Sequence, residues 1–261
     1  MMKPFMLLSF LSAVAYGLKL LDVPYADKIF FAAAVLVLLP VFLGRIRNKY
    51  NKISFMILML ICIVLYLNVY DNLLIYLAGK CKNNGVSFGV INALFNTFGL
   101  TDFENLMYHT SYGGAKLING RIVTGAVDLF TAKESSREGM MFLCGKYLSL
   151  FSALGIAFSI KKHRKDVFFI TLFAFLSGNL TVYLLMLLLV FTPYYFIFLL
   201  FTFISYFIAN TAMINGGFFV SGSFFELIVY RSNIVQILAV GVFLCAVSYY
   251  FSRLAKERLK W

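Results

Sequence analysis

The sequence predicts an all-α polytopic membrane protein with about six spanning helices and additional re-entrant segments. Three observations lead to this fold class. Hydrophobic residues make up 62 % of the 261 residues and charged residues only 13 %, whereas soluble domains average about 45–50 % and 25 %. Several apolar runs reach the roughly 17–25 residues that a bilayer-spanning helix requires. The basic residues gather in short segments that separate or follow these runs.

The placement of charge predicts the orientation in the membrane. Of the net charge of +12, RIRNKYNK (Arg45 to Lys52) carries +4, KKHRKD (Lys161 to Asp166) +3 and RLAKERLKW (Arg253 to Trp261) +3. Basic residues collect in the cytoplasmic loops of membrane proteins. We therefore expect both termini in the cytoplasm, a lipid bilayer as the surroundings and no nucleic acid partner.

Six apolar runs are expected to cross the membrane in order along the chain. A signal peptide is the alternative for the first, because Ala13-Val14-Ala15 resembles a cleavage site, but its short apolar part favours a retained helix. Residues 1–52 would form an N-terminal helical pair with a basic loop, and residues 53–261 the main membrane domain. The expected spans are Phe5–Leu21, Ile29–Gly44, Phe55–Leu77, Met140–Ile160, Tyr194–Ile214 and Ile234–Ser252.

A seventh apolar run, Val167 to Phe191, conflicts with this orientation, because seven crossings would leave the basic C-terminus outside. Ser177-Gly178-Asn179 in its middle is typical of a turn, since glycine and asparagine tolerate left-handed backbone. A turn at membrane depth must be buried in protein or line a wet cavity. We therefore expect a re-entrant segment near residues 170–190 with its tip near Gly178. The alternative is a plain helix that tolerates one glycine.

Residues 79–139 would begin and end on the outer side, and we expect this stretch to be irregular. KNNGVSFGVINALFNTFGL is apolar but is interrupted by Gly85, Gly89 and Gly99. It predicts a second segment, partly buried or re-entrant, near residues 87–102. SYGGAKLINGRIVTG is rich in glycine and predicts a loop. Arg45, Lys162 and Lys256 are then expected on one side of the membrane, and Asn83 and Lys133 on the other.

Four segments carry motif-like patterns in a familiar order. Phe98–Asp102 reads FGLTD, residues from Val123 read VTGAVDLFTAKES, Gly178–Leu185 reads GNLTVYLL, and Gly216–Tyr230 reads GGFFVSGSFFELIVY. They resemble the FGLHH, GDINRFFAGDP, GITEPIEF and GFSAGLIDYxL motifs of the glucose-type membrane (IIC) permeases of the bacterial phosphoenolpyruvate:sugar phosphotransferase system.

The resemblance implies an IIC-like fold in a bacterial inner membrane and a sugar permease subunit served by separate IIB and IIA proteins. No cysteine lies in a phosphorylation motif, so the chain would at most be the membrane subunit of a sugar phosphotransferase. The family dimerises through an N-terminal half that is shortened here, so a homodimer stays an open alternative. Neither a metal nor a cofactor is expected. The implied sugar-binding residues are Asn96, Thr101, Asp102, Gly178, Asn179 and Thr181.

Departures from the family pattern favour a second interpretation. Thr101 and Asp102 replace the two histidines of FGLHH, and Thr181 replaces the first glutamate of GITEPIEF. A hydrogen bond to a charged group contributes about 1.5–3 kcal/mol, so these losses would weaken sugar binding. The alternative is a transport-inactive relative that serves as a membrane regulator or binds a partner protein. An unrelated small-solute or lipid-linked transporter is the third possibility.

Lys146 is an ionisable residue seven positions into its expected helix. Ionisable groups at membrane depth indicate function by default. The opposing interpretation is that the flexible lysine side chain extends to the outer surface.

Overall fold

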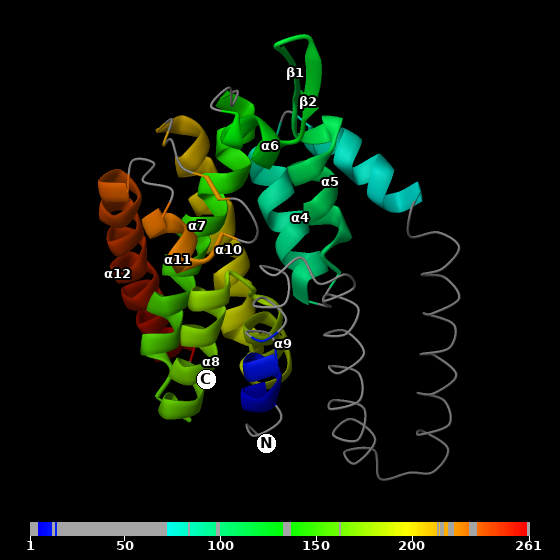
Figure 1. Cartoon of the computed structure of the whole chain (residues 1–261). Coiled ribbons are helices and arrows are strands. Elements are labelled where there is room, and N and C mark those ends of the chain that lie inside the picture. Colours follow the sequence, from blue (N-terminus) through cyan, green and yellow to red (C-terminus); the bar gives the residue numbers. More distant parts are fainter. Residues whose placement is uncertain are drawn as a thin grey trace, which may run out of the picture.

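The computed structural model is mostly helical in the residues that it describes (Figure 1). These are residues 5–11, 14, 72–82, 84–97, 100–132, 137–161, 163–212, 214, 217–218, 222–229 and 234–259. Residues 5–11 and 72–81 are helical. The further elements are α4 (Gly85–Thr97), α5 (Asp102–His109), η1 (Ser111–Gly113), β1 (Ala115–Ile118), β2 (Arg121–Thr124), α6 (Ala126–Thr131), α7 (Arg137–Ser159), α8 (Arg164–Ser177), α9 (Thr181–Val190), α10 (Thr192–Thr211), α11 (Phe224–Val229) and α12 (Ile234–Leu259).

Three of the described helices are long and apolar enough to cross a membrane. The apolar stretches are Phe142–Ser159 in α7, Thr192–Thr211 in α10 and Ile234–Arg258 in α12. They match the last three spans expected from the sequence. Most of the first three expected spans lies outside the described residues, so the total of about six stays a prediction, as does the division of the chain near residue 52.

Helix α7 forms the centre of the bundle, where it packs against α10 and α12. Its apolar stretch is 89 % buried, compared with 22 % for that of α12. Small residues allow the close approach that membrane helices use: a Cβ added at Gly155 would lie 2.1 Å from the Cys245 carbonyl oxygen. The Ser248 hydroxyl on α12 donates to the Ser152 carbonyl on α7 at 3.1 Å.

The apolar run Val167 to Phe191 is not one continuous helix. It forms α8 and α9, which are joined at Gly178 with a φ of 71° in the left-handed region. Helix α8 has 14 residues and α9 has 10, each fewer than the roughly 17–25 that span a bilayer. The turn expected at Ser177-Gly178-Asn179 is therefore present, whereas its re-entrant position in a membrane stays a prediction.

The glycine-interrupted stretch around residues 85–109 is regular, contrary to the expectation of irregular chain. It forms the two short helices α4 and α5, and α4 packs against α7, α9 and α10. Gly85 and Gly89 lie on the buried face of α4, at helical spacing with Phe88 and Asn92. The expectation was wrong because it rested on glycine as a helix breaker, whereas here glycine allows neighbouring helices to approach.

SYGGAKLINGRIVTG forms a β-hairpin instead of the loop expected from its glycine content. Strands β1 and β2 are antiparallel, with Leu117 opposite Ile122. Asn119 and Gly120 have φ values of 48° and 75°, and Asn-Gly is the preferred pair for such two-residue hairpin turns. Figure 1 shows the hairpin projecting beyond the helices.

Phe88 on α4 forms the centre of an aromatic core that fixes α4 against three neighbouring helices. Its ring lies 5.6 Å from Phe103 and 6.0 Å from Tyr108 on α5. It lies 5.1 Å from Phe142 on α7 and 5.8 Å from Tyr206 on α10. Aromatic pairs at such distances add to the free energy of burial. The core therefore sets the spacing between α5 and α7, from which the central polar side chains extend.

The two basic segments that the structure describes in part lie at the same end of the molecule. Figure 1 shows the start of α8, next to Lys161, and the end of α12, which carries Lys256, at the end opposite the β-hairpin. Of the other residues used for the orientation, Arg45, Lys162, Asn83 and Lys133 lie outside the described residues. The sides of the membrane themselves stay a prediction.

Candidate functional site

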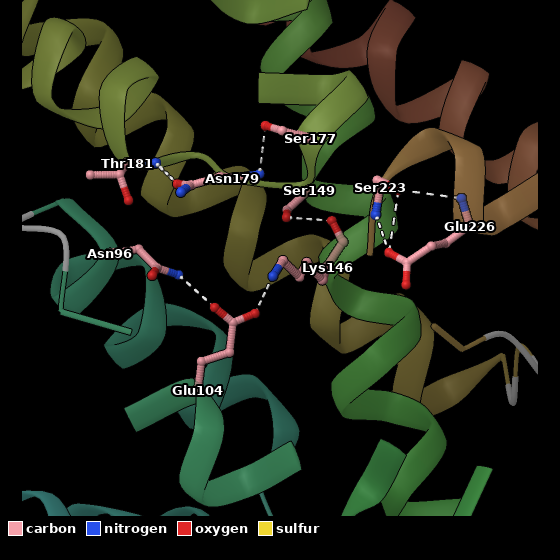
Figure 2. A network of polar contacts seen from close by, with 9 residues as sticks. All are labelled: Asn96, Glu104, Lys146, Ser149, Ser177, Asn179, Thr181, Ser223 and Glu226. Carbon is pink, nitrogen blue, oxygen red and sulfur yellow. Dashed lines mark hydrogen bonds and ion pairs between the residues drawn. The ribbon is translucent and has the colours of Figure 1, made fainter. Parts of the chain in front are cut away.

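Polar side chains from several helices meet in the interior of the protein (Figure 2). Burying a polar group is costly unless it is hydrogen-bonded, so a concentration of such groups marks a candidate site. All except Asn179 are buried. We call the following residues the polar cluster: Asn96, Glu104, Lys146, Ser149, Ser177, Asn179, Thr181, Ser223 and Glu226.

An ion pair between Glu104 on α5 and Lys146 on α7 forms the centre of the polar cluster. Lys146 Nζ donates to Glu104 Oε1, and each side chain is only 8 % exposed. Removing one partner of a buried ion pair typically costs about 3–5 kcal/mol, because the other charge stays buried without compensation. Lys146 therefore lies in the interior and does not extend to the outer surface.

The local sequence explains how Glu104 reaches the interior. Helix α5 buries Phe103, Glu104, Met107 and Tyr108, which lie on one face at spacings of three and four residues. The apolar members of this face pack into the core. They direct the carboxylate of Glu104 toward α7 rather than toward solvent.

Aromatic rings enclose the ammonium group of Lys146. Its Nζ lies 5.7 Å from the centre of the Tyr108 ring and 5.3 Å from that of Phe218. Ring faces attract cations at such distances, and more strongly in a desolvated site. Gly222 lies close to both Phe218 and the lysine: a Cβ added there would lie 2.9 Å from the Phe218 ring and 3.3 Å from Lys146 Cδ. The Glu104 carboxylate and the two aromatic rings together fix the position of the Lys146 ammonium group.

Asn96 extends the polar cluster toward α4. Its Nδ2 donates to Glu104 Oε2 at 3.4 Å, so the two carboxylate oxygens have different partners. Next to Asn96, the hydroxyl groups of Thr97 and Tyr195 are 3.0 Å apart. The C-terminal end of α4 thus presents one amide and one hydroxyl to its neighbours.

Two polar side chains of the α8–α9 turn serve the turn itself. The Asn179 backbone N–H donates to the Ser177 hydroxyl at 3.2 Å, and the Thr181 N–H donates to Asn179 Oδ1 at 2.9 Å. Such local bonds are a common reason for serine and asparagine at turns. The side chains of Ser177 and Asn179 are therefore explained by the turn without a ligand.

Thr181 differs from its neighbours in the turn. Its side chain is buried, and its Oγ1 has no hydrogen-bond partner among the described residues. Figure 2 shows this hydroxyl pointing toward Asn96. An unsatisfied buried hydroxyl is unfavourable by about 1–3 kcal/mol, so a polar partner at this position would stabilise it.

Ser223 and Glu226 form a capping box at the start of α11. Glu226 Oε2 accepts from the Ser223 N–H at 3.0 Å, and the Glu226 N–H donates to the Ser223 hydroxyl at 3.3 Å. This reciprocal pattern is a standard helix start. It accounts for the buried carboxylate of Glu226.

The structure brings together some of the residues that the sequence predicted as sugar ligands. Asn96, Asn179 and Thr181 belong to the polar cluster, and Gly178 forms the turn beside it. Asp102 is exposed.

Thr101 is half-buried, and its carbonyl accepts from the Asn105 N–H at 3.1 Å. Thr101 is not among the residues of the polar cluster. The sequence alone did not select Glu104, although an acid on the apolar face of a short helix is a signal for it.

The arrangement offers hydrogen-bond acceptors and donors side by side with little net charge. Carboxylate, amide and hydroxyl groups next to aromatic rings suit an uncharged solute with several hydroxyl groups. Among the described residues, no group of three or more His, Cys, Asp or Glu side chains converges as a metal site would require. In comparisons with known proteins, neither a family model nor a curated protein matches this sequence.

Proposed function

We propose that the protein is a membrane permease subunit for a sugar, of the IIC type, and that the polar cluster binds the sugar. The observation that carries the proposal is the buried Thr181 hydroxyl without a partner among the described residues, which points across the polar cluster toward Asn96 and Glu104. A sugar hydroxyl between them would donate to the carboxylate and accept from Thr181.

Two pairs of short helices support this proposal. The two helices of the α4–α5 pair contact each other, as do those of the α8–α9 pair, and α4 packs against α9. Irregular backbone at membrane depth is tolerated where it is buried in protein or lines a path for solute. The turns of both pairs would then be re-entrant, and the polar cluster would lie between them.

The basic residues at the start of α8 and at the end of α12 support a proposed orientation in the membrane and a proposed docking end for a partner protein. Arg164 and Lys165 of α8 lie at the same end of the molecule as the last turns of α12. This end would face the bacterial cytoplasm. A separate IIB protein would dock there and phosphorylate the sugar.

Binding of labelled sugars to the purified protein tests this proposal. Glucose, mannose, fructose, N-acetylglucosamine and maltose form the panel, and at least one should bind. Asn96→Ala should weaken that binding about two- to tenfold, since a hydrogen bond between uncharged groups contributes about 0.5–1.5 kcal/mol. Thr211→Ala is the control, because Thr211 is exposed and its hydroxyl bonds to the carbonyl of Phe207 in its own helix. No binding by any member of the panel would contradict the proposal.

One observation favours a second candidate, a transport-inactive relative that acts as a regulator. Glu104 is already neutralised by Lys146, so the principal carboxylate of the site has a partner without any sugar. In that case no sugar of the panel would bind, and the protein would instead be recovered in a complex with a IIB protein co-produced with it.

A further inference from the structure

We propose that Glu104 is a proton-binding site and that its protonation opens the ion pair between α5 and α7. The inference goes beyond sugar binding, because it assigns a second species, the proton, to the same region. It does not depend on which solute, if any, the protein carries.

The first argument is the burial of this ion pair. Within the described part of the chain, the pairs His109–Asp128, His163–Asp166 and Arg253–Glu257 each expose about a third or more of both side chains. Only 8 % of each side chain is exposed in Glu104–Lys146. Charged pairs at membrane depth are expensive to bury, and they mark proton and ion pathways.

The second argument is that the pair is a direct polar link between α5 and the central helix α7. Glu104 belongs to the short helix α5, whereas Lys146 belongs to the central helix α7. Apolar packing is non-directional, so it permits small shifts of α5 that a direct ion pair prevents. Loss of the charge on Glu104 would remove this link.

The third argument concerns the other groups that face Glu104. They are Lys146 from α7, Tyr108 from α5 itself, Tyr206 from α10 and the neutral amide of Asn96 from α4. Burial, and then the nearby Glu104 charge, hold the pKa of Tyr108 well above its usual range. Ammonium groups and phenols already carry their protons at neutral pH, so among these groups only the carboxylate of Glu104 is able to accept a proton on acidification.

The proposed step is a simple proton addition. A proton from the aqueous phase forms an O–H bond with a carboxylate oxygen of Glu104, and the charge of that side chain changes from −1 to zero. Lys146 keeps its proton, and the rings of Tyr108 and Phe218 continue to hold its ammonium group. Asn96 still has an oxygen of Glu104 as acceptor. The contact is thus present at higher pH and is lost as the pH falls.

Infrared titration of the ligand-free protein in lipid nanodiscs tests proton binding directly. A protonated carboxyl band should appear reversibly on acidification and be missing in Glu104→Gln. Asp128→Asn is the matched control: Asp128 also pairs with a basic residue, but about half of its side chain is exposed. Lys146→Met should shift the Glu104 band to higher pH, because removal of an opposite charge favours the neutral acid.

Hydrogen exchange then tests the opening of the pair. In the wild type, exchange of α5 amides relative to α12 amides should rise about tenfold on acidification. In Glu104→Gln and in Glu104→Gln/Lys146→Met, the exchange of α5 amides relative to α12 amides should not depend on pH. The double variant should stay folded because it leaves no unpaired charge. A carboxylate that stays ionised until the protein unfolds would overturn the proposal. So would an acid-induced rise that persists in Glu104→Gln. Either result would leave the measured sugar binding, and hence the proposed function, unaffected.

Discussion

Tyr206 on α10 provides the sharpest test of how the helices around the polar cluster pack. Its ring lies between two glycines, Gly89 on α4 and Gly145 on α7. A Cβ added at Gly89 would lie 2.2 Å from Tyr206 Cδ2, and one added at Gly145 would lie 2.3 Å from Cδ1. The ring cannot move away from one added methyl without moving toward the other helix. Gly145→Ala should therefore destabilise the protein.

The magnitude follows from two opposing contributions. Ordinary contacts of a Cβ begin near 3.4 Å, so the added methyl at Gly145 overlaps the ring by more than 1 Å. Overpacking of this kind costs about 1–3 kcal/mol, and the trapped ring places Gly145→Ala at the upper end. Alanine is the better helix former by about 1 kcal/mol. We expect a net loss of about 2 kcal/mol in the free energy of unfolding.

Gly79→Ala is the control for the gain in helix propensity. Gly79 lies in the helical residues 72–81, and a Cβ there would meet only Tyr112 Cε1, at 4.0 Å. This variant should be stabilised by up to about 1 kcal/mol. Unfolding in mixed detergent micelles, followed by circular dichroism, gives both values.

A second variant identifies the ring as the cause. Gly145→Ala in a Tyr206→Leu background should cost much less than in the wild type, because the trapped ring is gone. The reasoning would be refuted if Gly145→Ala and Gly79→Ala changed the stability equally, or if the cost of Gly145→Ala were the same in both backgrounds.

Two further predictions concern the turn and the orientation. Gly178→Leu should lower the free energy of unfolding by about 1–2 kcal/mol, because residue 178 has left-handed backbone. If the segment were a straight helix, the same change would raise it by nearly 1 kcal/mol. Gly120→Leu is the control: Gly120 has a φ of 75° and no atom of the described residues near its Cβ position, so this variant measures the backbone cost alone in the same unfolding assay. Single cysteines at Lys256 and Arg121, in a background without the native cysteines, should differ in intact cells: a membrane-impermeant reagent should label position 121 and not 256. Strong labelling at 256 would contradict the cytoplasmic C-terminus.

The sequence was sufficient for those elements whose signal is local. Helices α7, α10 and α12 are long apolar runs, and length with composition identifies such runs without reference to the rest of the chain. The turn at Gly178 could also be predicted, since a Ser-Gly-Asn triplet inside an apolar run favours a turn over a continuous helix.

The outer stretch could not be predicted correctly because glycine has two opposite uses. Gly89 weakens α4 as an isolated helix, but its missing side chain makes room for Tyr206, which lies far away in the sequence. A single sequence does not reveal that partner. In the hairpin, Asn119-Gly120 did carry a local signal, but the glycines around it suggested a loop instead.

The sequence also did not identify which acidic residue of the site is buried. Asp102 and Glu104 lie two residues apart on α5, and comparison by motif position selected Asp102. The helix turns Asp102 to the surface and Glu104 to the interior, where Lys146 meets it. The direction of each side chain follows from the apolar face of α5. The partner follows only from the packing of α5 against α7.

This placement changes what a restored carboxylate in the turn should do. Thr181→Glu places a glutamate where the motif of the sugar permeases that this sequence resembles has one, but Glu104 already supplies a carboxylate from across Asn96 (Figure 2). Two facing carboxylates disfavour each other's ionised form, so the single variant should lose stability and gain little sugar affinity. Thr181→Glu/Glu104→Gln keeps one carboxylate in the region and should bind sugar more tightly than Glu104→Gln alone. If the double variant folds and binds no better than Glu104→Gln, the Thr181 hydroxyl does not face the sugar, and the polar cluster is a structural feature of the helix packing.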